Sequence, residues 1–134
     1  MAEPANIEIA ETNAGVDSLM LRLDRMSTLT SGWDSYGAEP PSQQAITNAR
    51  AFVALLESEN ILPVTVLPSS AGGVGITFEE QNLQAFVEFR NDGSKALMFS
   101  DFDSEETELV SIPERETNPQ SIVRRIQEFL NAAQ

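Results

Sequence analysis

The chain has 134 residues, with 21 acidic side chains against 8 basic ones and a formal net charge of -13. It contains neither histidine nor cysteine, which excludes disulfides, thiolate metal sites and the imidazole group on which most acid–base catalysis depends. Phosphates and anionic lipids would repel so acidic a protein, so we expect no direct nucleic-acid partner and no membrane partner.

Hydrophobic residues make up 41% of the chain, a proportion typical of a folded protein, and the length predicts a single domain. Residues 1–13 are polar, acidic and aperiodic, so we expect a flexible acidic tail there, followed by one α+β domain over residues 14–134. The first residues carry no basic region and no apolar run, so no signal peptide is expected. The lack of cysteine is consistent with a reducing cytoplasm.

Two helices are predicted in the first half of the chain. Apolar residues recur with the helical period over 16–26, which predicts a helix that ends near Ser31-Gly32, where glycine supplies a C-terminal cap. Ser42 occupies an N-cap position. It precedes a second apolar stripe over 45–56, which predicts a helix that ends by Glu59-Asn60.

The second half predicts strands joined by tight turns and then a last helix. Pro68 bounds the first strand, and Asn91-Asp92-Gly93 is a hairpin signal. Asn118 caps the last helix, with Pro119 at its first position. We expect an α+β fold: two N-terminal helices, an antiparallel β-meander of about four or five strands, and one C-terminal helix packed on the sheet. The expected strands cover residues 64–67, 74–78, 85–90, 95–99 and 107–112.

One short segment holds the only tryptophan and the only tyrosine. Its sequence is Gly32-Trp33-Asp34-Ser35-Tyr36-Gly37-Ala38, followed by Glu39-Pro40-Pro41-Ser42. We expect a corner that orients two helices, pinned by Trp33 and Tyr36, with Asp34 accepting backbone N–H bonds inside the turn. The alternative is a small-ligand or peptide groove floored by Trp33 and Tyr36, with Asp34 as its polar contact.

This segment resembles the Gly-Trp-Asp/Asn-X-Tyr-X-Ala-X-Pro signature of a group of short bacterial and phage proteins of uncharacterised function. The stretch Gly72-Gly73-Val74-Gly75-Ile76 is similar to the glycine-rich strand that follows in that group, and the resemblance covers roughly residues 20–100. It implies a bacterial or phage origin and a shared α+β fold, and together with the lack of cysteine this gives an expected location in the cytoplasm of a bacterial host. It assigns no catalytic residues.

Few groups remain for catalysis. Lys95 is the only lysine. The glycines within 72–75 lack the Lys-Ser/Thr of a phosphate loop, so we expect a flexible turn there. The acidic run over 101–108 fails as a calcium hand, because Glu106 stands where glycine is required and Ile112 where a bidentate glutamate is required. We expect no catalytic residue, no metal and no cofactor. A carboxylate-based metal-dependent hydrolase remains the enzymatic alternative.

Acidic residues concentrate between residues 101 and 116, where Arg115 is the only basic side chain. If the start of this run is extended, its acids repeat at about 6.6–6.8 Å, close to every second phosphate of a DNA strand. We expect Glu88 to extend that surface from across a hairpin. The candidate partner-binding residues are Asp101, Asp103, Glu105, Glu106, Glu108, Glu114 and Glu116.

These observations favour a non-enzymatic interaction protein that binds and inhibits a basic, nucleic-acid-handling protein partner. Anti-CRISPR, anti-restriction and antitoxin proteins act in this way, and a phosphate-backbone mimic is one form of the hypothesis. The alternative explanation of the acidity is solubility, although a net charge of about 2–8 is enough for a small domain.

Overall fold

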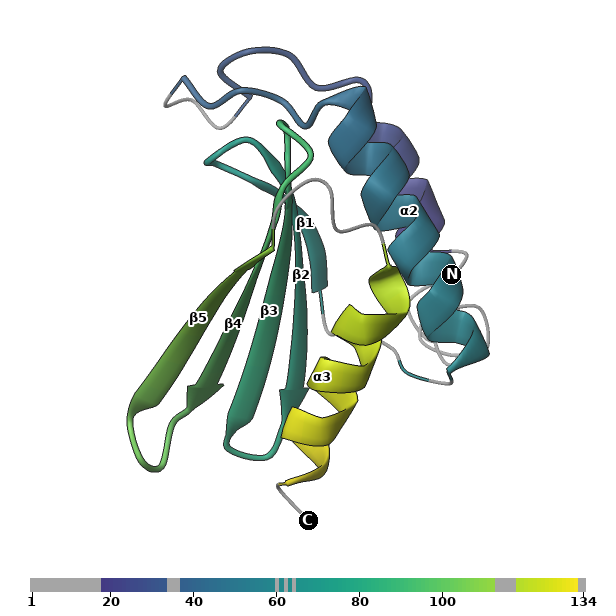
Figure 1. Ribbon diagram of the computed structural model, residues 1–134. Coiled ribbons are helices and arrows are strands. Elements are labelled where there is room, and N and C mark those ends of the chain that lie inside the picture. Colours follow the sequence, from purple (N-terminus) through teal and green to yellow (C-terminus); the bar gives the residue numbers. More distant parts are fainter. Residues whose placement is uncertain are drawn as a thin grey trace, which may run out of the picture.

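The computed structural model describes residues 18–33, 37–59, 61, 63, 65–112 and 118–132. The described residues form a five-stranded antiparallel sheet with helices packed on one face (Figure 1). A first helix covers 18–26. The other elements are α2 (Gln43–Ser58), β1 (Thr65–Ser69), β2 (Gly73–Glu80), β3 (Leu83–Arg90), β4 (Lys95–Asp101), β5 (Glu106–Ile112) and α3 (Pro119–Asn131). The α+β class and the antiparallel meander are confirmed. The predicted tail over 1–13 lies outside the described residues.

The first helix ends at residue 26, earlier than the predicted end near Ser31-Gly32. The hydroxyl of Ser27 donates to the Asp24 carbonyl at 2.6 Å, and that of Thr28 donates to the Arg25 carbonyl at 2.7 Å. Hydroxyl groups that bond nearby carbonyls compete with the helical ladder. The backbone N–H groups of Ser27 and Thr28 reach the same two carbonyls, three residues back, so the chain leaves the helix through a tighter turn.

The other two helices begin where their capping residues predict. The Ser42 hydroxyl accepts the backbone N–H of Ala45 at 3.1 Å at the start of α2. The Asn118 carboxamide accepts the N–H of Gln120 at 3.0 Å at the start of α3, and Pro119 is the first residue of that helix. Each cap pairs a backbone donor that the helix itself leaves free.

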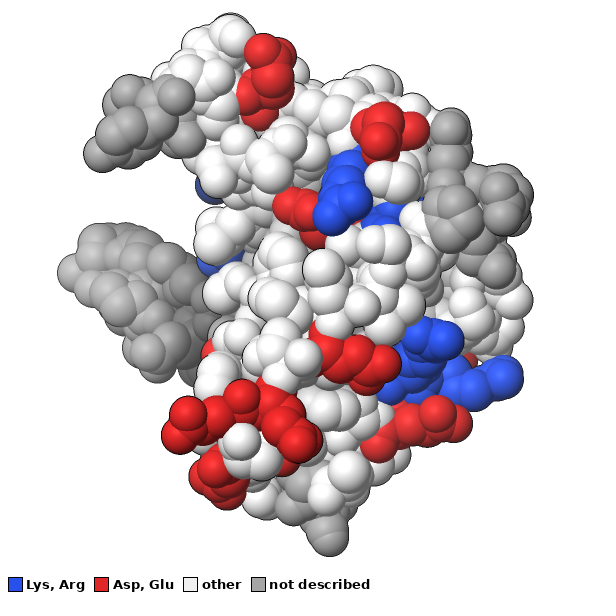
Figure 2. All heavy atoms as spheres, turned by 60° about the vertical axis from the view of Figure 1, so that its left-hand side comes forward, with Lys and Arg blue, Asp and Glu red and all other residues white. Residues whose placement is uncertain are grey.

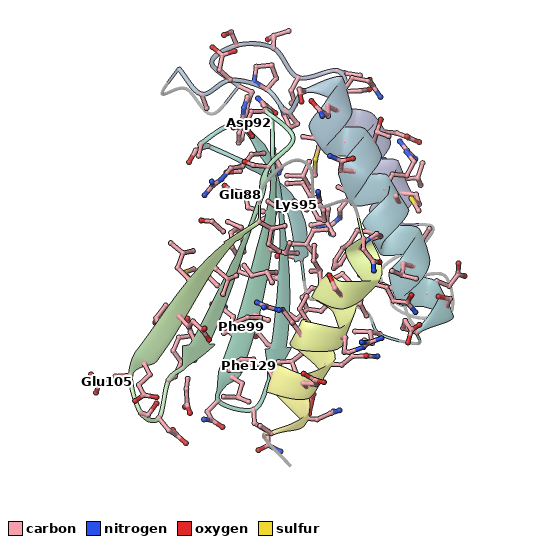
Figure 3. All side chains as sticks on the ribbon, viewed as in Figure 1. Glu88, Asp92, Lys95, Phe99, Glu105 and Phe129 are labelled. Atoms are coloured by element: carbon pink, nitrogen blue, oxygen red, sulfur yellow. The ribbon has the colours of Figure 1, made fainter. Side chains whose placement is uncertain are left out.

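The core lies between the helices and one face of the sheet. Phe52 of α2 is fully buried, and its ring centroid lies 6.3 Å from that of Phe78 and 5.2 Å from that of Phe89. A second ring pair joins Phe99 of β4 to Phe129 of α3, with centroids 4.9 Å apart (Figure 3). These contacts hold α2 over the middle of the sheet and α3 beside it.

The opposite face of the sheet carries no helix among the described residues (Figure 1). Phe86, Met98 and Leu109 lie in register on β3, β4 and β5 and form an apolar row on this open face. The Phe86 ring lies over Gly75, where an added Cβ would stand 2.8 Å from ring atom Cε1. Gly75 and Gly73 belong to β2, so the strand predicted over 74–78 is confirmed at Gly75, and the flexible turn predicted at these glycines is wrong for both.

Pro68 lies inside β1 and does not end it, contrary to the sequence prediction. The N–H of Asn91 bonds to the Gly72 carbonyl at 3.2 Å, and hydrogen-bonded pairs alternate along an antiparallel ladder. The even-numbered residues of β2 therefore bond to β3, and its odd-numbered residues bond to β1. Leu67 and Ser69 of β1 lie opposite odd-numbered residues of β2 and bond to them. The backbone of Pro68 then faces the free edge, where the N–H that proline lacks is not needed.

Candidate functional site: the acidic end of the sheet

Two turns meet at one end of the sheet, the β2–β3 turn and the β4–β5 turn (Figure 1). Asn82 joins them: its carbonyl accepts the Phe102 N–H at 2.9 Å, and its side-chain amide donates to Asp101 at 2.7 Å. Acidic side chains form their largest group at this lower end in Figure 2. We call the group the acidic end; its residues are Glu79, Glu80, Asp101, Asp103, Glu105, Glu106 and Glu108.

The acidic end has no opposite charge bound to it within the part of the chain that the structure describes. Asp101 is half-buried and the other six carboxylates are exposed. The two ion pairs among the described residues join Arg50 to Asp24 and Arg90 to Glu88, away from this end. Uncompensated like charges raise the local negative potential, which attracts cationic groups and speeds their approach.

The β4–β5 turn bends the residues whose match to the phosphate spacing depended on an extended chain. The Asp101 carboxylate accepts the backbone N–H groups of Asp103 at 3.0 Å and Ser104 at 3.4 Å, and Glu105 adopts a left-handed φ of 60°. Asp101, Asp103 and Glu105 therefore do not repeat along one strand. The predicted match to every second phosphate is wrong, because it required that extension.

The same contacts set the protonation of Asp101. Partial burial raises the pKa of this carboxyl, but hydrogen bonds from the Asn82 side chain and from the backbone N–H groups of Ser104 and Asp103 together outweigh it. The net pKa lies below its ordinary value of 3.8. Asp101 thus stays ionised near neutral pH and holds the turn that presents the neighbouring acids.

Glu106 and Glu108 lie on β5 on the side of the helices, since Glu108 is in register with Phe99 and Glu106 with Asp101. Leu109 projects to the open face with 65% of its surface exposed, and Phe102 in the turn is 59% exposed. Exposed apolar side chains among carboxylates are a common feature of interaction surfaces. The alternation of β5 alone would have indicated Leu109, whereas nothing in the sequence pattern indicated Phe102.

Sequence reasoning also missed Glu79 and Glu80. Both lie beyond the end of the predicted strand over 74–78, but they are the last residues of β2. The β2–β3 turn is only two residues long, with Gln81 at a left-handed φ of 55°. The consecutive acids were a visible signal. Their place beside the β4–β5 turn depends on the pairing of three strands.

Glu88 does not extend the acidic end, contrary to prediction. Its side chain is only 12% exposed on the open face, where it accepts the Ser69 hydroxyl at 2.6 Å and pairs with Arg90 at 3.0 Å. Figure 3 places Glu88 toward the other end of the sheet from Glu105. Two further predicted residues, Glu114 and Glu116, lie outside the described residues.

The corner predicted around the tryptophan is only partly described. Trp33 is half-buried, and its indole N–H donates to the Glu39 carbonyl at 3.0 Å. The polar atom of this side chain is therefore bonded within its own loop, which favours the corner over the groove. Asp34 and Tyr36 lie outside the described residues.

Other kinds of site have little support in the described part of the chain. It contains no group of three or more acidic, histidine or cysteine side chains arranged to hold a metal ion. Lys95 is buried on the helix side of β4, at the opposite end of that strand from Asp101, and lines a hollow of about 230 Å³ with Gln44 and Asn48. Among the helices that are described, none has the length and apolar character needed to cross a bilayer.

Comparison of the chain with protein-family models, with curated proteins and with solved structures finds no match. The resemblance of the segment around Trp33 to the bacterial and phage signature stays a prediction. The acidic end is therefore the feature from which a function can be inferred.

Proposed function

We propose that this chain is a non-enzymatic interaction protein that binds a basic, nucleic-acid-handling protein of the bacterial cytoplasm and inhibits it. The observation that carries the proposal is the acidic end, where seven carboxylates gather and none forms an ion pair within the described residues. A partner that binds nucleic acid presents lysine and arginine side chains to phosphates. Carboxylates can form ion pairs with the same lysine and arginine side chains and so exclude the nucleic acid.

The position of the charge supports a docking role more strongly than its amount does. Of the basic residues described, Arg22, Arg25 and Arg50 lie on the first helix and α2, and Arg124 and Arg125 lie on α3. The β4–β5 hairpin, residues 95–112, itself carries five acids and one basic residue, Lys95. Solubility alone requires no such clustering of acids, whereas oriented association does.

Capture from a bacterial lysate with two charge-matched variants tests the proposal. The edge-neutral variant carries Glu105→Gln, Glu106→Gln and Glu108→Gln. The control variant carries Glu39→Gln, Glu57→Gln and Glu59→Gln on and near α2, and each variant changes the net charge from -13 to -10 by adding three. The full chain and both variants are immobilised, and captured proteins are identified by mass spectrometry at about 0.05 M and about 0.5 M salt.

The full chain and the control variant should capture nucleic-acid-binding proteins at low salt and release them at high salt. The edge-neutral variant should capture them several-fold more weakly, because it lacks the charges that the partner faces. Added nucleic acid should compete with the chain for the captured protein. Equal capture by the edge-neutral and control variants would refute the proposal, and so would capture that survives high salt.

A further inference from the structure

β5 forms a free edge of the sheet, since only β4 pairs with it among the described strands. The bond between the Phe102 N–H and the Asn82 carbonyl fixes the alternation of hydrogen bonds along β4. Even-numbered residues of β4 bond to β3, so its odd-numbered residues bond to β5. The backbone N–H and C=O groups of Thr107, Leu109 and Ser111, which lie opposite even-numbered residues, consequently point away from the sheet.

The two edges of the sheet differ in how they are protected. At the β1 edge the outward-facing backbone groups belong to Val66 and Pro68, and proline has no N–H to offer. The first helix also lies close to that edge, where Met26 and Leu29 line a groove with Val66. β5 contains no proline, and its residues are exposed except near its end. An unprotected edge with free backbone groups is a template for an added strand.

The side chains of β5 define what an added strand would contain. Glu106 and Glu108 project to the helix side, whereas Thr107 and Leu109 project to the open face. A neighbouring strand would place alternate residues beside the two carboxylates and the others beside Leu109. There they would extend the apolar row of Phe86 and Met98. The matching segment alternates basic and apolar residues.

A second copy of this chain does not meet that requirement. Adjacent strands lie about 4.8 Å apart, which is less than the Debye length of about 8 Å at physiological salt. Pairing β5 with another β5 would bring two acidic ends within that distance, with no described basic residue to compensate them. Charge complementarity selects a basic strand.

We propose that β5 accepts an extended segment of the basic partner as an additional strand, with basic and apolar residues alternating along the segment. This inference rests on the proposed function and adds the mode of binding to it. Backbone hydrogen bonds to Thr107, Leu109 and Ser111 supply affinity for any extended chain, and the two faces of β5 supply selectivity.

A defined peptide tests the mode of binding without knowledge of the natural partner. The probe has seven residues, the length of β5, with lysine and valine alternating and both ends blocked. Two derivatives carry N-methyl groups, one on the valines and the other on the lysines. A further peptide has the same composition with its lysines and valines in separate blocks. Binding to the full chain is measured by calorimetry at about 0.15 M salt.

The alternating peptide should bind better than the block peptide. Residues that share a face with Leu109 bond directly to β5 in an antiparallel pair, so N-methylation of the valines should weaken binding about tenfold or more. N-methylation of the lysines should change it little. The reverse preference would indicate a parallel strand and would still support strand addition. Equal affinity of the two derivatives would overturn the proposal.

A variant of the chain provides the second arm. Leu109→Pro removes an outward-facing N–H without removing a bond to β4, and Leu109→Ala removes the apolar contact while keeping that N–H. In folded protein, verified by circular dichroism, Leu109→Pro should bind the peptide more weakly than Leu109→Ala. Equal binding would overturn strand addition. If lysate capture still depends on the acidic end in that case, the proposed function stands and only the mode of binding is wrong.

Discussion

Asn91 lies in the β3–β4 turn, and removal of its side chain should destabilise the whole domain. Its side-chain oxygen accepts the Ser42 N–H at 2.6 Å, and its amide donates to the Pro40 carbonyl at 3.0 Å. These bonds tie the β3–β4 turn to the start of α2 across about fifty residues of chain. Asn91→Ala leaves a partly buried donor and acceptor without partners, and each costs about 1–3 kcal/mol. Because both groups are only partly buried, we expect the free energy of unfolding to fall by about 2–4 kcal/mol, the lower part of the summed range.

Urea unfolding followed by circular dichroism measures this loss, and a thermal scan should show Tm lower by about 8–16 °C, at about 4 °C per kcal/mol for a domain of this size. Asn91→Asp is the matched control, because it keeps the acceptor for Ser42 and loses only the donor to Pro40. It should cost roughly half as much. A loss below about 0.5 kcal/mol for Asn91→Ala would show that the tie contributes nothing beyond an ordinary surface contact.

Three further predictions concern the core and the acidic turn. Phe52→Ala should cost about 3–5 kcal/mol in urea unfolding because Phe52 is fully buried, whereas Phe102→Ala, at a side chain that is 59% exposed, should cost under about 0.5 kcal/mol. Glu105→Gly should stabilise the fold by about 1 kcal/mol, since glycine tolerates the φ of 60°, and Glu105→Gln should not. The lowered pKa of Asp101 means that its contribution to stability is present above about pH 4 and is lost as the pH falls through the folded-state pKa. The difference in urea midpoint between the native chain and Asp101→Asn should therefore be largest near neutral pH and vanish in acid, and a constant difference would contradict this.

Local signals in the sequence were sufficient for most of the fold. Ser42 and Asn118 are good N-cap residues followed by periodic apolar stripes, so the starts of α2 and α3 could be predicted. Alternation of apolar residues in β3 and the turn at Asn91-Asp92-Gly93 indicated a hairpin. These features depend on neighbours within a few positions, which is why they are legible in a single chain.

The failures all involve relations between distant segments or competition within a short one. Pro68 looks like a strand terminus until the pairing with β2 shows that its missing N–H faces the free edge. Gly73 looks like a turn residue until its pairing with Arg90 of the next strand places it in β2. Asp101 looks like the start of an extended acidic run until its carboxylate captures two backbone N–H groups further along. Each outcome is set by a contact that alternation and composition do not encode.

The two edges of the sheet suggest why the charge lies where it does. Proline at the β1 edge weakens the pairing of any added strand, because one donor is missing whatever the partner is. Carboxylates beside the β5 edge exclude another acidic chain and admit a basic one. Solubility and binding are then two effects of the same residues.

The edge-neutral variant should therefore lose affinity for the alternating lysine–valine peptide and, in sedimentation at rising concentration, begin to self-associate. Leu109→Pro added to that variant should suppress the self-association. If the edge-neutral variant stays monomeric, or associates no more than the control variant, the acids at β5 do not protect that edge, and their position needs another cause.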